Sequence, residues 1–120
     1  MITEILKAYD DMAIPAMNVS QLRGETERLS ELIGYLTEKA KAYREEKDIK
    51  GAEAIEQIVL DDLQFEFESV YGQFEEEFKN WEQKYKRLEN VCTYYGVPVA
   101  TLKDNKVIQF RKELNNELGN

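Results

Sequence analysis

A row of large apolar residues with a seven-residue period constrains this chain more than any other feature. The row contains Leu60, Phe67, Phe74, Trp81, Leu88 and Tyr95, and a second row four residues later contains Tyr71, Phe78, Tyr85 and Cys92. Five consecutive heptad steps are typical of a helix with coiled-coil character. The pattern therefore predicts one long helix over about residues 52–95.

The residues before this segment supply helices of similar combined length. Leu22, Leu29, Leu36 and Tyr43 are again seven residues apart, which predicts a helix over residues 19–47. Residues 1–14 have helical apolar spacing and are followed by Pro15, which predicts a separate short N-terminal helix. With a turn near Gly51, the expected fold is all-α: an elongated helical hairpin or small helical bundle, with the first helix extending the shorter arm.

The C-terminal part begins with a helix stop signal, Gly96-Val97-Pro98. Beyond it, residues 98–120 are predicted to form a helical tail, with Val107, Phe110, Leu114 and Leu118 at helical spacing. A small hairpin around residues 103–106 is the alternative. Residues 95–102 resemble the turn of helix-turn-helix domains. However, Val107-Ile108 is apolar where base-reading side chains are needed, so we favour a tail that packs on the hairpin.

Composition limits the broad class of the protein. With 120 residues, the chain has the length of a single helical domain covering residues 1–120. Sixteen Lys and Arg against 24 Asp and Glu give a net charge of −8, which argues against direct binding to nucleic acid or to an anionic membrane. A lone cysteine, no basic leader and no apolar run of 18 residues predict a cytoplasmic location.

Several classes of enzyme are disfavoured. The chain has no histidine, which excludes Ser-His-Asp and Cys-His nucleophile systems and the usual zinc sites. All-α nucleotide pyrophosphohydrolases hold magnesium with Glu-x-x-Glu followed by Glu-x-x-Asp. Glu53 and Glu56 supply the first element here, but Glu45 and Asp48 supply the second in the wrong order. We therefore expect no catalytic, cofactor or metal site, and we expect Cys92 to be a small buried hydrophobe.

The aromatic residues are the first candidate site. Nine of the thirteen lie between residues 65 and 95. The predicted protein-binding residues are Phe67, Tyr71, Phe74, Phe78, Trp81 and Tyr85. Packing inside the hairpin explains many of them equally well. The apolar set also includes residues off the two rows, such as Phe65 and Tyr94, and a stripe that wide is more than one neighbouring helix covers. The surplus indicates a protein partner, a homo-oligomer or both.

The acidic residues are the second candidate site. Residues 51–78 contain nine acids and no Lys or Arg. The predicted acidic ridge consists of Asp61, Asp62, Glu68, Glu75, Glu76 and Glu82. Such a ridge keeps a helix soluble, steers a partner or imitates a phosphate backbone. The predicted function is a non-enzymatic protein-binding module, either an adaptor or an inhibitor. The alternative is an acidic nucleic-acid mimic that occupies the basic channel of a nucleic-acid-binding enzyme, as phage-type anti-defence proteins do.

Overall fold

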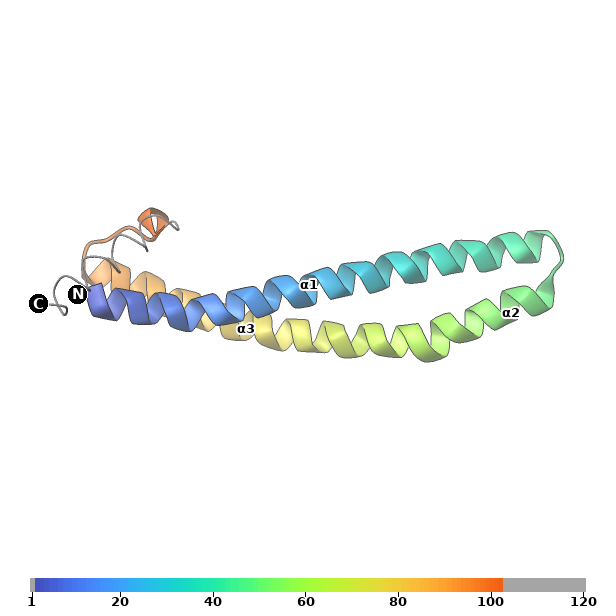
Figure 1. The fold of residues 1–120 in the computed structure, drawn as a ribbon, viewed down its shortest axis with the longest axis horizontal. Helices are drawn as coiled ribbons and strands as arrows, with labels where there is room; N and C mark the ends of the chain where they lie inside the picture. Colours follow the sequence, from blue (N-terminus) through green and yellow to red (C-terminus); the bar gives the residue numbers. More distant parts are fainter. Residues whose placement is uncertain (1, 103–120) are drawn as a thin grey trace, which may run out of the picture. The chain divides into compact units, whose positions relative to one another are not determined.

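The computed structural model describes residues 2–102, and helices account for most of them (Figure 1). The elements in chain order are α1 (Ile2–Glu45), α2 (Ile49–Gln57), the π-helix η1 (Ile58–Leu63), α3 (Gln64–Tyr94) and the 3₁₀ helix η2 (Val99–Thr101). Residues 2–102 contain no strand, so the predicted all-α helical hairpin is confirmed. The chain divides into two compact units: unit 1 is Met1–Asn18 with Glu77–Asn120, and unit 2 is Val19–Glu76.

Unit 2 contains the reversal of the chain between α1 and α2, which lie side by side here (Figure 1). Lys47 adopts a left-handed conformation with φ 66° in this turn. Asp48 then caps α2, because its carboxylate accepts a hydrogen bond of 3.0 Å from the Gly51 backbone N–H. A Cβ atom on residue 51 would lie 2.9 Å from the Asp48 carboxylate, so a larger residue there would have to displace this carboxylate. The turn therefore falls where the sequence predicts it.

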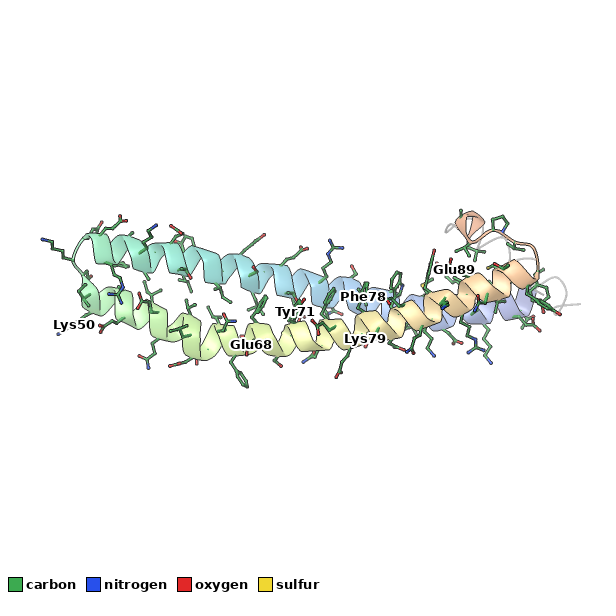
Figure 2. The ribbon with its side chains drawn as sticks, turned by 180° about the vertical axis from the view of Figure 1, so that it is seen from behind. Lys50, Glu68, Tyr71, Phe78, Lys79 and Glu89 are labelled. Carbon is green, nitrogen blue, oxygen red and sulfur yellow. The ribbon has the colours of Figure 1, made fainter. Side chains whose placement is uncertain are left out.

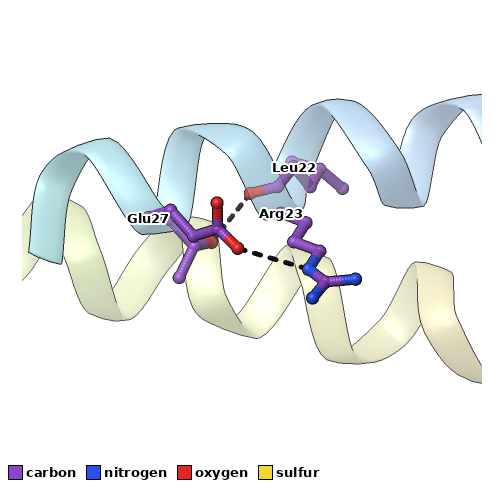
Figure 3. Close-up of polar contacts among 4 residues, drawn as sticks. Leu22, Arg23 and Glu27 are labelled. Atoms are coloured by element: carbon purple, nitrogen blue, oxygen red, sulfur yellow. Dashed lines mark hydrogen bonds and ion pairs between the residues drawn. The ribbon is translucent and has the colours of Figure 1, made fainter.

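The interior of unit 2 is built largely from small and half-buried side chains. Ala40, Ala52 and Val59 are buried, whereas the α1 row predicted from Leu22, Leu29 and Leu36 is only half-buried. Polar side chains of α1 bond within the helix: Thr26 Oγ1 donates to the Leu22 carbonyl, and Arg23 Nε pairs with Glu27 at 3.3 Å (Figure 3). These local bonds leave apolar packing as the main interaction between the two arms.

Pro15 lies inside α1, and this corrects the predicted division into helices over residues 1–14 and 19–47. Proline inside a helix gives up the hydrogen bond to the carbonyl four residues earlier and costs about 3 kcal/mol. Pro15 is buried, and it follows the buried Ala8 by seven residues on one face of α1. Burial of its ring on that face offsets the lost bond, so the helix continues through residue 15.

The long helix predicted over residues 52–95 runs from Ile49 to Tyr94, but η1 interrupts its α-helical geometry. Its first predicted interior residue, Leu60, is 67% exposed, and its neighbour Val59 is buried instead. Ala52 and Val59 are seven residues apart, as are Phe67 and Phe74, but the step from Val59 to Phe67 is eight. The π-helix absorbs this one extra residue, with the Gln64 N–H bonded to the Val59 carbonyl.

Unit 1 has its own small core. Ile5 and Ala8 of α1 pack with Leu88 and Cys92 of α3. Cys92 is fully buried, as predicted, and burial raises the pKa of its thiol.

The segment that follows α3 covers this core. Gly96 has φ 71°, and the Val97 N–H bonds to the Cys92 carbonyl at 2.8 Å. Together with the bond from the Gly96 N–H to the Thr93 carbonyl, this forms a Schellman motif, so the predicted stop is confirmed. Val97, Val99 and Leu102 then pack on the core. The predicted helical tail past residue 102, and its hairpin alternative, lie outside the described residues.

Deletion of Asp62 should stabilise the fold. It restores a seven-residue step between Val59 and Phe67, so that a regular α-helix replaces η1. We expect a rise in Tm of roughly 4 °C, which corresponds to about 1 kcal/mol, measured by circular dichroism at fixed protein concentration. Deletion of Ser30 is the control, because it breaks the α1 heptad and should lower Tm. A loss of Tm that is equal in both variants would contradict this account of η1.

Two glycine substitutions should act in opposite directions. Gly96→Ala places a Cβ at φ 71° and should destabilise the protein by about 1 kcal/mol. Gly34→Ala, in α1 with no atom within 4 Å of the new Cβ, should stabilise it by about 1 kcal/mol. Urea midpoints measure both effects. Stabilisation by Gly96→Ala would argue against the left-handed cap.

Candidate protein-binding surface

The six predicted protein-binding aromatics form one ring cluster in each unit. In unit 2, Tyr71 contacts Phe67 and Phe74, with ring centroids 5.9 and 6.2 Å apart. In unit 1, Trp81 contacts Phe78 and Tyr85 at 5.6 and 5.3 Å. Tyr71 and Phe78 are exposed and the other four are half-buried. Each cluster therefore has one ring that is exposed to water and two that are partly covered by protein.

Three exposed apolar side chains of the return arm, which consists of α2, η1 and α3, lie in the π-helix or directly after it. Ile58, Leu60 and Phe65 have exposed fractions of 48%, 67% and 73%. Asp61 and Asp62 lie between them, and both are exposed. We call these five residues the π-helix surface. The sequence singled out Phe65 as surplus but placed Leu60 in the interior row and missed Ile58. The signal that would have found them is the eight-residue step between Val59 and Phe67.

The π-helix explains why Leu60 and Phe65 are exposed together. A π-helix bonds residues five apart, as Gln64 and Val59 are here, and the same spacing separates Leu60 from Phe65. In a regular α-helix a five-residue step turns the side chain away by more than a quarter of a turn. The wider turn of η1 reduces that rotation, so the two side chains lie closer to one outer face.

The acidic ridge is fully at the surface. Asp61, Asp62, Glu68, Glu75, Glu76 and Glu82 are all exposed. Glu68 and Tyr71 both lie on α3 (Figure 2). Glu68 accepts a hydrogen bond of 3.5 Å from Gln64 Nε2. None of the six carboxylates forms an ion pair with another residue in the part of the chain from 2 to 102. Lys79 and Lys86 follow Glu75 and Glu82 by four residues, so bases lie close to the C-terminal part of the ridge, whereas residues 51–78 contain none.

An apolar hollow adjoins the π-helix surface in unit 2. It has a volume of about 310 Å³, and Leu60 and Val59 form part of its wall opposite Thr37 and Ala40 of α1. A bidentate ion pair stands at the same hollow, with Arg44 Nε and Nη2 each 2.7 Å from a Glu56 carboxylate oxygen. The hydrogen bond from Arg44 lowers the pKa of Glu56 below its ordinary value. This pair holds α1 to α2 beside the exposed Leu60.

Unit 1 presents a second open hollow, of about 470 Å³. Its lining includes Glu4, Arg87 and Tyr94, and Tyr94 is 82% exposed. The Tyr94 ring meets the Tyr95 ring edge-on at 4.9 Å, and the Tyr95 hydroxyl donates a hydrogen bond to the Glu4 carboxylate. The exposed Tyr94 ring is therefore held against a neighbour that is itself anchored to α1.

Two other kinds of feature are absent from the described residues. Within residues 2–102, no group of three or more His, Cys, Asp or Glu side chains gathers closely enough to hold a metal ion. No helix in that range combines the length and apolar character needed to cross a membrane. No protein-family model, curated protein or solved structure matches this chain.

The Arg44–Glu56 pair should make stability depend on pH. The pKa of Glu56 in the folded protein is lowered from its ordinary value of 4.5. The stabilisation by the pair is therefore fully present at neutral pH, and it is lost as the pH falls below 4.5 and through the lowered pKa. We expect Glu56→Gln to lower the urea midpoint at about pH 7, and we expect this difference from the wild type to shrink as the pH is lowered below the ordinary pKa of Glu56. Glu31→Gln, at an exposed position of α1, is the control. A difference that persists unchanged in acid would contradict this contribution.

Proposed function

We propose that this protein is a non-enzymatic protein-binding module that contacts its partner through the π-helix surface. The observation that carries the proposal is the exposure of Ile58, Leu60 and Phe65 within eight residues that also contain two acids and no base. Single exposed apolar residues are common on soluble proteins, whereas a cluster of large ones surrounded by charge is typical of an interaction site. The π-helix adds support, since such turns are frequent at functional sites.

The charge around the surface indicates the chemistry of the partner. Residues 51–78 carry nine acids and no bases, so the complementary surface is apolar at its centre and basic at its edge. An amphipathic helix with Leu or Phe on one face and Lys or Arg on the other has this character. In this mechanism Leu60 and Phe65 supply affinity, while Asp61 and Asp62 steer the approach and select the partner.

The mimicry of nucleic acid is a second candidate, supported by one observation. The six ridge carboxylates are exposed and form no ion pair with described residues, so they are accessible to a basic channel. Their density is the weaker point. Nine acids over 28 residues of helix give one charge per roughly 4.7 Å, whereas duplex DNA has one per roughly 1.7 Å. Direct apolar contact is therefore the leading proposal.

Loss of the apolar side chains should weaken partner binding selectively. The probe is a labelled amphipathic helical peptide of about 18 residues, with Leu on one face and Lys on the other, followed by fluorescence anisotropy. We expect Leu60→Ser/Phe65→Ser to raise Kd roughly tenfold or more. The matched control is Met17→Ser/Tyr94→Ser, which removes exposed apolar residues from unit 1 and should leave peptide binding unchanged.

Two outcomes would count against the proposal. Equal affinity of the wild type and Leu60→Ser/Phe65→Ser would remove the π-helix surface as the contact. Binding that survives this change but is lost in Glu68→Gln/Glu75→Gln/Glu76→Gln, with a steep dependence on salt, would favour the acidic ridge and mimicry instead. Far-UV circular dichroism of each variant establishes that helicity is retained.

A further inference from the structure

We propose that the apolar hollow of unit 2 is a binding site for one alkyl carboxylate, a free fatty-acid anion with a chain of about eight carbons. Its volume of about 310 Å³ lies at the lower end of the range for cavities that bind small molecules. The residues that line it all belong to unit 2. The hollow shares Leu60 with the π-helix surface, but its ligand is a small molecule, so this inference goes beyond the proposed function and does not depend on it.

Two helix stripes line the hollow. Side chains three and four residues apart lie on the same side of a helix. The stripe on α1 has this spacing and consists of Thr37, Ala40, Lys41 and Arg44. The opposite stripe has the same spacing across the junction of α2 and η1, and it consists of Glu56, Val59 and Leu60. The hollow therefore has a continuous wall on each side.

Small side chains make room between the two walls. Ala40 and Val59 are both buried at the hollow. The register change at η1 brings Val59 to the interior, whereas the larger Leu60 is exposed at the edge. A leucine in place of either small residue would extend further into the space between the walls. The hollow is thus a consequence of the same inserted residue that forms the π-helix.

The walls favour a saturated chain over a ring. None of the described residues that line the hollow is aromatic, so the protein offers no ring there to stack on a ligand ring. Ala40, Val59 and Leu60 supply aliphatic surface, and the stems of Lys41 and Arg44 add CH₂ groups to it. Burial of one ligand CH₂ group on such surface strengthens binding about fourfold. An alkyl chain is therefore the apolar body that suits this hollow.

Lys41 supplies the charge that recognises a carboxylate. Arg44 is already bound to Glu56 by two hydrogen bonds of 2.7 Å, and the Thr37 hydroxyl donates to the Ile33 carbonyl. Lys41, in contrast, forms no hydrogen bond or ion pair with any residue from 2 to 102. Its ammonium group lies at the edge of an apolar hollow, where a charge-assisted hydrogen bond to a carboxylate fixes the orientation of the ligand.

The acids of unit 2 make the sign of the ligand charge decisive. Residues 51–78 carry nine acids and no base, and their combined field favours a cation. At the hollow itself, however, both carboxylate oxygens of Glu56 are bound to Arg44, whereas Lys41 has its donors available. Direct contact with Lys41 is stronger than the pull of more distant exposed charges, because distance and salt weaken the latter. An anion is therefore the preferred ligand.

Titration calorimetry of the full chain with three eight-carbon ligands tests this preference. The ligands are octanoate, octylammonium and 1-octanol, in about 150 mM salt. We expect octanoate to bind one site per chain, roughly tenfold more tightly than octylammonium. Hexanoate should bind roughly tenfold more weakly than octanoate, since it lacks two CH₂ groups. Octylammonium that binds as tightly as octanoate would overturn the assignment of an anion.

Two variants locate the ligand in the hollow. Lys41→Gln should weaken octanoate binding roughly fivefold or more and leave 1-octanol unchanged. Its matched control is Lys50→Gln, which removes the same charge from an exposed position of α2 outside the lining of the hollow (Figure 2). Ala40→Leu fills the hollow and should weaken both octanoate and 1-octanol roughly tenfold or more. Far-UV circular dichroism establishes that Ala40→Leu remains helical, and the exposed Lys41→Gln keeps the test decisive if it does not.

Three results would overturn the site. The first is the absence of saturable octanoate binding up to about 10 mM. The second is an equal effect of Lys41→Gln and Lys50→Gln on octanoate affinity. The third is full octanoate affinity in a folded Ala40→Leu variant. None of these results bears on the amphipathic peptide, whose binding through Leu60 and Phe65 is measured separately.

Discussion

The fold depends on how one extra residue is accommodated between two stretches of heptad repeat. Ala52 and Val59 follow one seven-residue register, and Phe67 and Phe74 follow another that is displaced by one position. A regular α-helix would carry one of the two stretches off the face that packs on α1. The π-helix keeps both stretches on that face. The free-energy cost of the π-helix is confined to residues 58–63, whereas the apolar packing that it preserves involves residues on both sides of it, from Ala52 to Phe74.

The same accommodation determines what reaches the surface. Because Val59 is interior, the larger Leu60 is displaced outward, where it joins Phe65 beside two carboxylates. A small interior residue and a large exposed one are the reverse of what hydrophobic burial alone favours. The Arg44–Glu56 pair and the Asp48 cap hold the turn and the helix that precede this arrangement. Stability is thus given up locally in favour of a presented apolar surface.

Much of this architecture was predictable because it depends on patterns that repeat. Heptad spacing identified the long return arm, and the Gly96-Val97-Pro98 stop and the turn before Gly51 marked its ends. Pro15 was misjudged because its local cost is visible in sequence, whereas the burial of its ring is a tertiary effect. The sequence pattern places Leu60 in the interior because Leu60 precedes Phe67 by seven residues. A strict seven-residue period cannot show that one residue is inserted between the two heptad stretches. The ridge acids were found at the surface, since charge patterning requires no knowledge of the partner.

Cys92 gives the protein a chemical reporter of its own. It is the one cysteine in the sequence, it is fully buried between α1 and α3, and the segment after Gly96 folds over the same core. Burial raises the pKa of its thiol, so little thiolate is present while the core is closed. Reaction with a disulfide reagent then requires the α1–α3 contact of unit 1 to open. The rate of thiol modification therefore measures how often this contact opens. Because Cys92 lies in unit 1, the rate reports on unit 1 and not on unit 2.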